Sequence, residues 1–342
     1  MKTINWYPGH MKKTRELIEA NLKLVDVVCE VCDARIPFSS RNPIIDEMAA
    51  GKPRILVLNK SDLADRGATN EWLEFFRVKG VGAGAEKGVT QGAEKGAEHS
   101  AEKGVGAGAL ALNAMSGEGV NALLRKLGDI AEKKAASGKA KALIPLRLMI
   151  VGIPNSGKSS LINRLTGRRA AQVGNRPGVT RGKQWLTLEN GMQLLDTPGI
   201  LWPKFENQEV GLKLAFCGSI RDEIMDLPDL GLELIRVLAG DYPDLLAERY
   251  GLEGLQLRHE AEYGEMEDGD AGLCDASDGG VSTDKALAVM EEIALKRGLI
   301  LPGRHIDYGR TARTVLDEFR AGKIGRITLE RPRPAHAEPG FS

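Results

Sequence analysis

Short apolar runs alternate with helical segments through the first two hundred residues of the chain. The runs are continuous in apolar character and rich in valine, isoleucine and leucine. Strands buried on both faces of a parallel sheet need this pattern, whereas strands with one solvated face alternate. The pattern therefore predicts an α/β fold with a doubly wound sheet. The predicted strands lie within 24–34, 54–62, 109–117, 146–151 and 192–196.

The second half of the chain has a different character. Segments 230–252, 284–300 and 308–325 have helical rather than strand-like patterns. We therefore expect a sheet domain over 1–205 and a smaller all-helical domain over 206–342. A length of 342 residues allows each domain a core of its own.

Two segments interrupt these patterns and have the character of insertions. Residues 78–108 form a degenerate Gly-Ala-Glu-Lys repeat, dense in glycine and with charges that cancel. Such a segment cannot offset the entropy cost of becoming ordered, so we expect it to be flexible. Residues 263–284 are acidic and rich in turn-forming residues. We expect the repeat to be neutral for function.

Composition and charge limit the kinds of partner that the chain is expected to bind. The formal net charge is zero, so no global field draws the chain to nucleic acid, and local asymmetry would have to do so. Residues 296–342 provide it, with ten Lys or Arg against five Asp or Glu. No run of about eighteen apolar residues indicates a membrane span, and the N-terminus lacks the features of a signal peptide. The expected location is the cytoplasm, with no membrane attachment.

Four cysteines do not make a disulfide framework in a chain of this size. Cys29 and Cys32 form a CxxC pair inside a predicted strand, where positions three apart point to opposite faces. A zinc site would need a second pair of ligands, and the sequence shows none. We interpret both cysteines as small buried apolar residues.

The stretch GIPNSGKSS predicts a phosphate-binding loop, because Gly152, Gly157, Lys158 and Ser159 have the required spacing between an apolar strand and a helix. The glycines let backbone N–H groups wrap the β-phosphate at a helix N-terminus. Lys158 would neutralise β and γ oxygens, and the Ser159 hydroxyl would bind Mg²⁺. The expected nucleotide contacts of this loop are Asn155, Ser156, Gly157, Lys158, Ser159 and Ser160.

Two further motifs suit the γ-phosphate. In DTPG, Asp196 ends an apolar strand, where a carboxylate can hold Mg²⁺ through water, and the Gly199 N–H can meet the γ-phosphate. In RPGVTRG, Thr180 is the candidate to contact Mg²⁺ when the γ-phosphate is present. Taken alone, DTPG is also compatible with a simple β-turn and Thr180 with an ordinary loop residue.

The stretch NKSD, after a buried strand, indicates guanine recognition. The Asp62 carboxylate can accept two charge-assisted hydrogen bonds from guanine N1 and N2, each worth roughly 1.5 to 3 kcal/mol, and adenine lacks this donor pair. Asn59 would brace the neighbouring loops, and the Lys60 stem would lie along the purine face. In NAMSG, the Ala114 N–H would donate to guanine O6. Each motif alone is compatible with a polar turn, but together they strongly indicate a GTP site.

These motifs occur in an unusual order, because the base motifs precede the phosphate motifs. Joining the original termini and opening new ones elsewhere would preserve the site in three dimensions. The sheet is therefore predicted to be circularly permuted, with the break after DTPG. The segment that senses the γ-phosphate would then run directly into the helical domain.

The combination resembles the circularly permuted GTPases that act late in assembly of the large ribosomal subunit. The resemblance is carried by NWYPGHM, DARIPFSSRNP, NKSD, GIPNSGKSSLIN, RPGVTRG and DTPGILWPKFE, up to about residue 210. It implies hydrolysis of GTP to GDP and phosphate with Mg²⁺, activation by the ribosomal particle, and an RNA-contacting helical domain. The implied partners are the precursor of the large (50S) subunit and its rRNA, and we expect a monomer.

The resemblance also assigns roles to single residues. Ile200 stands where small GTPases place a water-orienting glutamine, which implies intrinsic hydrolysis on the order of 10⁻⁴ s⁻¹ or slower. His10 matches a family histidine proposed to orient water, although beside Trp6 it is also compatible with a packed structural residue. Asn155 is similar to an asparagine that helps hold K⁺, or else caps its loop. The expected catalytic residues are His10, Lys158, Thr180 and Gly199; the expected metal ligands are Ser159, Thr180 and Asp196 for Mg²⁺ and Asn155 for K⁺.

Other function classes remain open. A GTP-dependent switch could bind a protein partner and never touch the ribosome, in which case a protein activator supplying an arginine would stimulate hydrolysis. A nucleotide sensor without hydrolysis fits the intact phosphate and metal motifs less well. For RNA contact the expected residues are Arg310, Arg313 and Arg320, although exposed charges on a helix are often merely solvated.

Overall fold

The computed structural model divides the chain into two compact units. The sheet unit contains the described residues up to Leu214 together with 328–332, and the helical unit contains those from Ala215 to Ile327. Most of the expected repeat and of the acidic segment lies outside the described residues, as do His10, Thr180, Gly199 and Ile200, while Val78 and Gly108 at the two ends of the repeat belong to a helix and a strand. The structure describes residues 11–49, 51–80, 108–136, 145–167, 184–196, 208–252 and 281–332.

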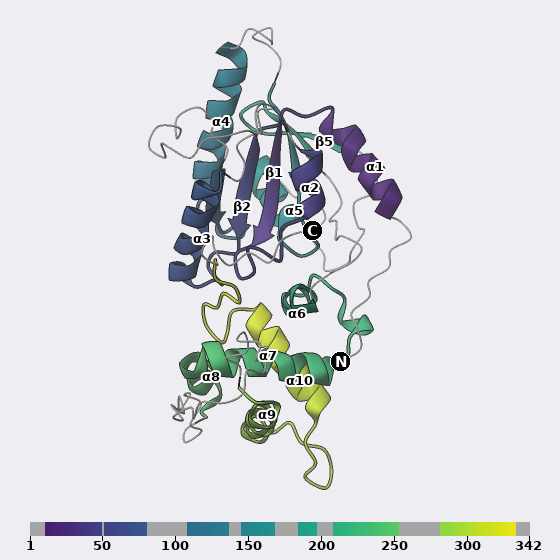
Figure 1. Cartoon of the computed structure of the whole chain (residues 1–342), viewed down its shortest axis with the longest axis vertical. Coiled ribbons are helices and arrows are strands. Elements are labelled where there is room, and N and C mark those ends of the chain that lie inside the picture. The colour runs from purple at the N-terminus through teal and green to yellow at the C-terminus, as the bar shows by residue number, and fades with distance from the viewer. Residues whose placement is uncertain are drawn as a thin grey trace, which may run out of the picture. The chain divides into compact units, whose positions relative to one another are not determined.

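A six-stranded sheet organises the sheet unit, in the order β3-β2-β1-β4-β6-β5 (Figure 1). Neighbouring strands run parallel except β5, which is antiparallel to β6 at the edge. The predicted α/β fold with a doubly wound sheet is confirmed, and β5 was not predicted. The strands are β1 (Val27–Asp33), β2 (Arg54–Asn59), β3 (Gly108–Leu112), β4 (Arg147–Val151), β5 (Gln184–Thr187) and β6 (Gln193–Asp196).

Helices cover both faces of this sheet, as continuous apolar strands require. One face packs against α4 (Val120–Ala136) and α5 (Lys158–Thr166). The opposite face packs against α1 (Met11–Leu22), α2 (Pro43–Met48) and α3 (Arg66–Val78). The sheet unit is therefore a three-layer sandwich.

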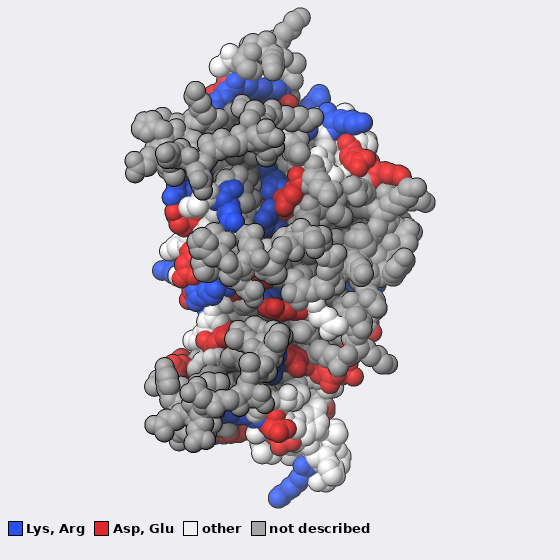
Figure 2. Space-filling model, in the orientation of Figure 1, with Lys and Arg blue, Asp and Glu red and all other residues white. Residues whose placement is uncertain are grey.

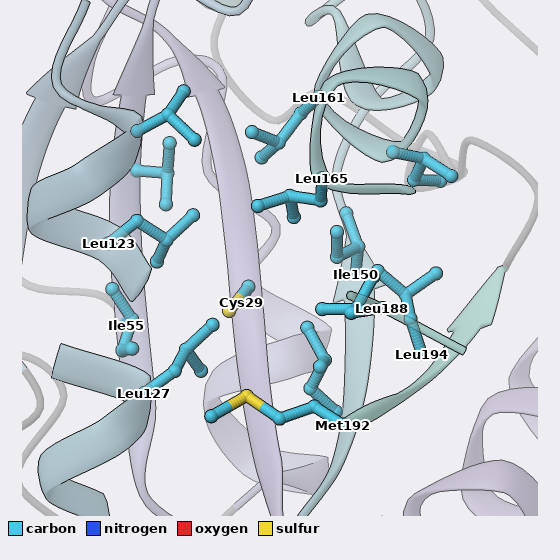
Figure 3. Close-up of a cluster of buried hydrophobic side chains, with 14 of the residues drawn as sticks. Cys29, Ile55, Leu123, Leu127, Ile150, Leu161, Leu165, Leu188, Met192 and Leu194 are labelled. Atoms are coloured by element: carbon cyan, nitrogen blue, oxygen red, sulfur yellow. The ribbon is translucent and has the colours of Figure 1, made fainter. Parts of the chain in front are cut away.

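The alternation of side chains along β1 divides the core between the two faces. Figure 3 shows Leu123 and Leu127 of α4 on one side of Cys29 and Leu161 of α5 on the other. Cys32, three positions further along β1, belongs instead to the cluster built on α3. Both thiols are fully buried and free, which confirms that they serve as small apolar residues, and burial raises the pKa of Cys29 to about 12.

The register of the sheet brings the motif-bearing loops to one edge. Asn59 is aligned with Asp33 of β1 on one side and with Leu112 of β3 on the other. Across the sheet, Ile150 of β4 is aligned with Asp196. Since these strands are parallel, their carboxyl ends share an edge, which is where open α/β sheets bind ligands.

The helical unit confirms the helices predicted for the second half of the chain. A single helical segment was expected over 230–252, but the chain breaks at Tyr242, because the ring of Pro243 disfavours continuation. Gly231 lets α7 approach α10, since a Cβ there would lie 2.4 Å from that of Ala312. The helices are α7 (Leu227–Asp241), α8 (Pro243–Tyr250), α9 (Thr283–Arg297) and α10 (Tyr308–Arg320), preceded by α6 (Gln208–Phe216) and the short η1 (Asp222–Ile224).

The chain passes from the sheet unit into the helical unit within α6, between Leu214 and Ala215. It returns to the sheet unit at Thr328. The helical unit is thus attached to the sheet unit at both ends. Within the described residues, every helix is too short or too polar to cross a bilayer.

Candidate functional site

The loop between β4 and α5 has the backbone of a phosphate cradle. Gly157, the N-cap of α5, has φ +89°, and a Cβ there would lie 2.1 Å from Asn59 Nδ2. A Cβ on Gly152 would lie 2.3 Å from the Val31 carbonyl oxygen. At Gly152 the obstacle is backbone, and at Gly157 a Cβ would displace the Asn59 amide at a φ that other residues rarely adopt, so both positions favour glycine. Asn155 also has a positive φ, of 59°, which asparagine tolerates better than most residues.

Lys158 lies back across this loop. Its ammonium donates a hydrogen bond of 2.6 Å to the Ile153 carbonyl oxygen, and the residue is only 8% exposed. A buried ammonium at the N-terminus of α5 gives the loop a positive potential suited to phosphate.

The donors expected for Mg²⁺ are described only in part. Ser159, in the first turn of α5, is partly exposed, and its hydroxyl is the hard oxygen donor that Mg²⁺ prefers. Asp196 ends β6 at the same edge of the sheet, while its side chain lies outside the described atoms. These residue types fit a Mg²⁺ ion beside the cradle, where such an ion would neutralise phosphate charge.

Asn59 connects the phosphate loop to the loop after β3. Its Nδ2 donates a hydrogen bond of 2.8 Å to the Ser156 carbonyl oxygen, and its Oδ1 accepts one of 3.0 Å from the Ala114 N–H. The residue is 2% exposed, so both bonds are protected from water. Asn59 therefore braces the neighbouring loops, in the manner that the sequence suggested.

The loop after β3 is held from two directions. Asn113 Oδ1 accepts from the backbone N–H groups of Met115 (2.8 Å) and Ser116 (3.1 Å), which shapes the turn. Arg164 of α5 donates to the carbonyl oxygens of Ala114 (3.2 Å) and Met115. The Ala114 N–H itself donates to Asn59, so its donation to guanine O6 stays a prediction.

The NKSD loop presents one open carboxylate and one tethered lysine. Among the described residues none donates a hydrogen bond to the Asp62 carboxylate, which is partly exposed. Lys60, with φ 60°, forms an ion pair of 2.8 Å with Asp33 Oδ2. Asp62 is thus available for the N1 and N2 donors of guanine. The position of the Lys60 ammonium is fixed by its ion pair with Asp33.

A buried ion pair supports this tether. Arg35 donates to both carboxylate oxygens of Asp33, at 2.9 and 2.8 Å, and both side chains are 1% exposed. Burial alone would raise the pKa of Asp33, but the charges of Arg35 and Lys60 outweigh it and hold the pKa well below its ordinary value. Asp33 is therefore ionised at neutral pH.

Two supporting contributions escaped the sequence analysis, although they shape the site. Asp33 and Arg35 lie in the stretch DARIPFSSRNP, which carried the family resemblance but received no role of its own. Their spacing of two, at the end of a strand next to NKSD, is a local signal of a carboxylate held by its neighbour. Arg164 had no comparable signal, because only the fold brings α5 to the loop after β3.

The arrangement as a whole can bind a guanine nucleotide. A cradle for phosphates, a loop with an open carboxylate for the base, and a third loop braced against both meet at one edge of the sheet. The roles expected for His10, Thr180 and Gly199 fall outside the described residues and stay predictions.

Comparison with known proteins supports this interpretation. A family model described as 50S ribosome-binding GTPase matches residues 147–239. The chain is 39% identical to ribosome biogenesis GTPase A of Priestia megaterium, over 97% of this chain and 98% of that protein. It is also 34% identical to mitochondrial ribosome-associated GTPase 1 of Mus musculus, over 95% of this chain and 90% of that one.

Solved structures agree with the sequence relatives. The structure of GNP-bound YlqF from T. maritima is similar with a TM-score of 0.56 at 27% identity. That likeness covers 93% of this chain and 98% of the other. It therefore includes both the sheet unit and the helical unit.

Proposed function

This chain belongs to the ribosome biogenesis GTPase A family, and from that premise we propose that it hydrolyses GTP during assembly of the large ribosomal subunit. The observation that carries the proposal is the pair of hydrogen bonds by which Asn59 joins the phosphate loop to the loop after β3. That brace, next to the open carboxylate of Asp62, is what selective binding of GTP requires.

In the proposed cycle, Thr180 would contact Mg²⁺ and the Gly199 N–H would contact the γ-phosphate when GTP is bound. Lys158 and the backbone N–H groups of the phosphate loop would bind the β- and γ-phosphates, and Ser159 and Asp196 would hold the metal. Asn155 would add a K⁺ ion beside the phosphates. The 50S precursor then accelerates hydrolysis, with His10 orienting the attacking water in place of a glutamine, and the GDP form leaves the particle.

The proposed RNA contact rests on the helical unit. Charges of both signs are mixed over the visible face in Figure 2, so binding to rRNA would depend on a local basic surface rather than on net charge. Arg310 and Arg313 are exposed and one helical turn apart on α10.

Arg320, in contrast, is a structural residue. It donates to both carboxylate oxygens of Asp222 at 2.8 Å and to the carbonyl oxygens of Ala215 and Phe216. Because those four bonds already use its guanidinium, we propose Arg310 and Arg313 rather than Arg320 for the RNA contact.

Single-turnover GTP hydrolysis, with and without purified large ribosomal subunit, tests the proposal. We expect the subunit to accelerate the wild-type protein at least tenfold, about 1.4 kcal/mol of barrier, in K⁺ buffer. His10→Ala should lose that acceleration while still binding GTP. A Na⁺ buffer serves as the comparison for the K⁺ ion assigned to Asn155.

The same preparations test the RNA contact. The double variant Arg310→Glu, Arg313→Glu should weaken binding to the subunit, whereas Lys133→Glu, an exposed lysine of α4 in the sheet unit, should not. If the subunit leaves hydrolysis unchanged and a protein activator stimulates it, the chain is a protein-partner switch instead. Sedimentation of the free protein would check the expected monomer.

A further inference from the structure

The C-terminal strap, defined as residues 328–330, is the first part of the chain to return from the helical unit to the sheet unit. Its three residues are between 3% and 7% exposed, although Thr328 and Glu330 are polar. A buried polar segment outside a helix or strand needs specific partners for its hydrogen-bonding groups. The partners of Thr328 and Glu330 therefore indicate what the strap does.

One side of the strap is bonded to the segment that follows β1. The Leu329 N–H donates to the Arg35 carbonyl oxygen at 2.8 Å. The Glu330 carboxylate accepts from the N–H of Phe38 at 2.7 Å and from the N–H of Ser39 at 3.2 Å, and the Ser39 hydroxyl also donates to it. The strap therefore fixes the backbone directly after Asp33, the residue that tethers Lys60.

The other side of the strap is bonded to the end of the NKSD loop. The Asp65 N–H donates to the Thr328 hydroxyl oxygen at 3.0 Å. Asp65 in turn caps α3, because its carboxylate accepts from the Ala68 N–H at 2.7 Å. The Trp72 indole N–H of α3 donates to the Glu330 carbonyl oxygen at 3.0 Å. The residue that ends the base-reading loop is thus held in place by the strap.

The two segments that connect the sheet unit to the helical unit also come together at Glu330. Lys213 of α6, the next-to-last residue before the boundary, places its ammonium 3.9 Å from Glu330 Oε1. Burial raises the pKa of Glu330, while Lys213 and the hydrogen bonds from Ser39 and Phe38 oppose that effect. The carboxylate is thus a buried junction shared by both connections to the helical unit.

We propose that Thr328 and Glu330 are positioning residues for guanine nucleotide binding. The strap holds the segment after β1 and the end of the NKSD loop in the arrangement that binds the base. The strap follows directly on the helical unit in the chain. This inference rests on the guanine-binding role proposed for Asp62, and it is independent of the ribosome.

A matched pair at Thr328 tests the proposal in the full-length protein without ribosomes. Thr328→Val has nearly the same shape but offers no acceptor to the Asp65 N–H, whereas Thr328→Ser keeps one. Stopped-flow release of fluorescent GDP and GTP analogues gives the dissociation rates. We expect Thr328→Val to raise both rates by the same factor, roughly fivefold to tenfold, as the loss of one buried hydrogen bond implies. Thr328→Ser should remain within twofold of the wild type.

An equal increase in the dissociation rates of GDP and GTP is the informative result, because a defect in base binding affects both nucleotides alike. Unchanged rates in a folded Thr328→Val protein would overturn the proposal. So would a lower melting temperature with unchanged rates, or factors that differ between GDP and GTP. Arg326→Ala, an exposed residue two positions before the strap, is the control and should release nucleotide at the wild-type rate.

Glu330→Gln provides a second test if Thr328→Val does not fold. It retains one acceptor oxygen and the volume of the side chain but weakens the bonds from Phe38 and Ser39. We expect faster release of both nucleotides again, and wild-type release from the folded variant would contradict the proposal. Asp62→Asn tests the underlying assignment, because it should weaken GDP and favour a xanthine nucleotide, whose O2 carbonyl can accept from the new amide.

Discussion

The side-chain amide of Asn59 donates a hydrogen bond of 2.8 Å to the carbonyl oxygen of Ser156, ninety-seven positions away in the sequence. This bond joins the end of β2 to the loop that wraps phosphate. The circular permutation changes the order in which these two elements are synthesised but leaves their contact intact. A site assembled from strand ends depends on sheet order and register rather than on chain order.

Removing the Asn59 amide should weaken the protein and its site together. Asn59→Ala leaves the Ser156 carbonyl and the Ala114 N–H buried without their partner, which costs roughly 1 to 3 kcal/mol for each group. We expect the free energy of unfolding, measured in urea, to fall by about 2 kcal/mol or more, and nucleotide affinity to fall at least tenfold. Asn70→Ala, an exposed asparagine of α3, is the control and should change neither quantity.

The phosphate loop should not tolerate a methyl group at its second glycine. Gly157→Ala would force a Cβ to 2.1 Å from Asn59 Nδ2 at a φ of +89°, so the Asn59 brace must move. We expect nucleotide binding in a fluorescence titration to fall at least tenfold. Gly128→Ala is the matched control, because a Cβ there on α4 meets nothing within 4 Å. It should stabilise the protein by up to about 1 kcal/mol, and wild-type binding by Gly157→Ala would refute the steric argument.

The sequence predicted the sheet and the phosphate loop because both leave strong local signals. Continuous apolar runs marked the buried strands, and the spacing of glycines and Lys158 marked the cradle. The strand β5 was missed because its four residues, QWLT, form no apolar run, and Trp185 is 39% exposed at the sheet edge. Pairing with β6 creates this strand, and pairing is a tertiary property.

The supporting residues of the site were harder to predict for a related reason. Glu330 lies 291 positions from Ser39 in the sequence, and a lone glutamate near the end of a basic tail carries no periodic or motif signal. The sequence pattern predicts that residues 328–332 belong to the helical domain, whereas in the structure they belong to the sheet unit. Long-range polar contacts of this kind become visible only with the fold.

The grip of Arg164 on the loop after β3 should depend on its forked guanidinium. Arg164→Lys keeps the charge but cannot donate to the Ala114 and Met115 carbonyl oxygens from one planar group. We expect GDP and GTP affinity to fall about threefold to tenfold, with little change in melting temperature, because Arg164 lies on the surface side of α5. Arg125→Lys on α4 is the control. Equal affinities for Arg164→Lys and the wild type would show that Asn59 alone positions this loop.

Acid should weaken the helical unit through Glu318. Its carboxylate accepts from Arg249 at 2.9 and 2.6 Å and lies 3.5 Å from Arg297. The hydrogen bonds from Arg249 hold the pKa of Glu318 below its ordinary value of 4.5, against the effect of burial. A lowered pKa means that the interaction stabilises the fold at neutral pH, and that this contribution is lost as pH falls from about 4.5 through the folded-state pKa.

Glu318→Gln isolates this contribution. At pH 7 the variant should be less stable than the wild type by about 1 to 3 kcal/mol, because it loses a charge-assisted pair. Below pH 4 the difference should shrink, since the wild-type carboxylate is then partly protonated in the unfolded chain and progressively in the folded one. Urea unfolding at both pH values measures it, with Glu248→Gln, an exposed glutamate of α8, as the control. A difference between Glu318→Gln and the wild type that stays constant from pH 7 to pH 3 would show that packing, rather than the charge of Glu318, holds α10 against α8.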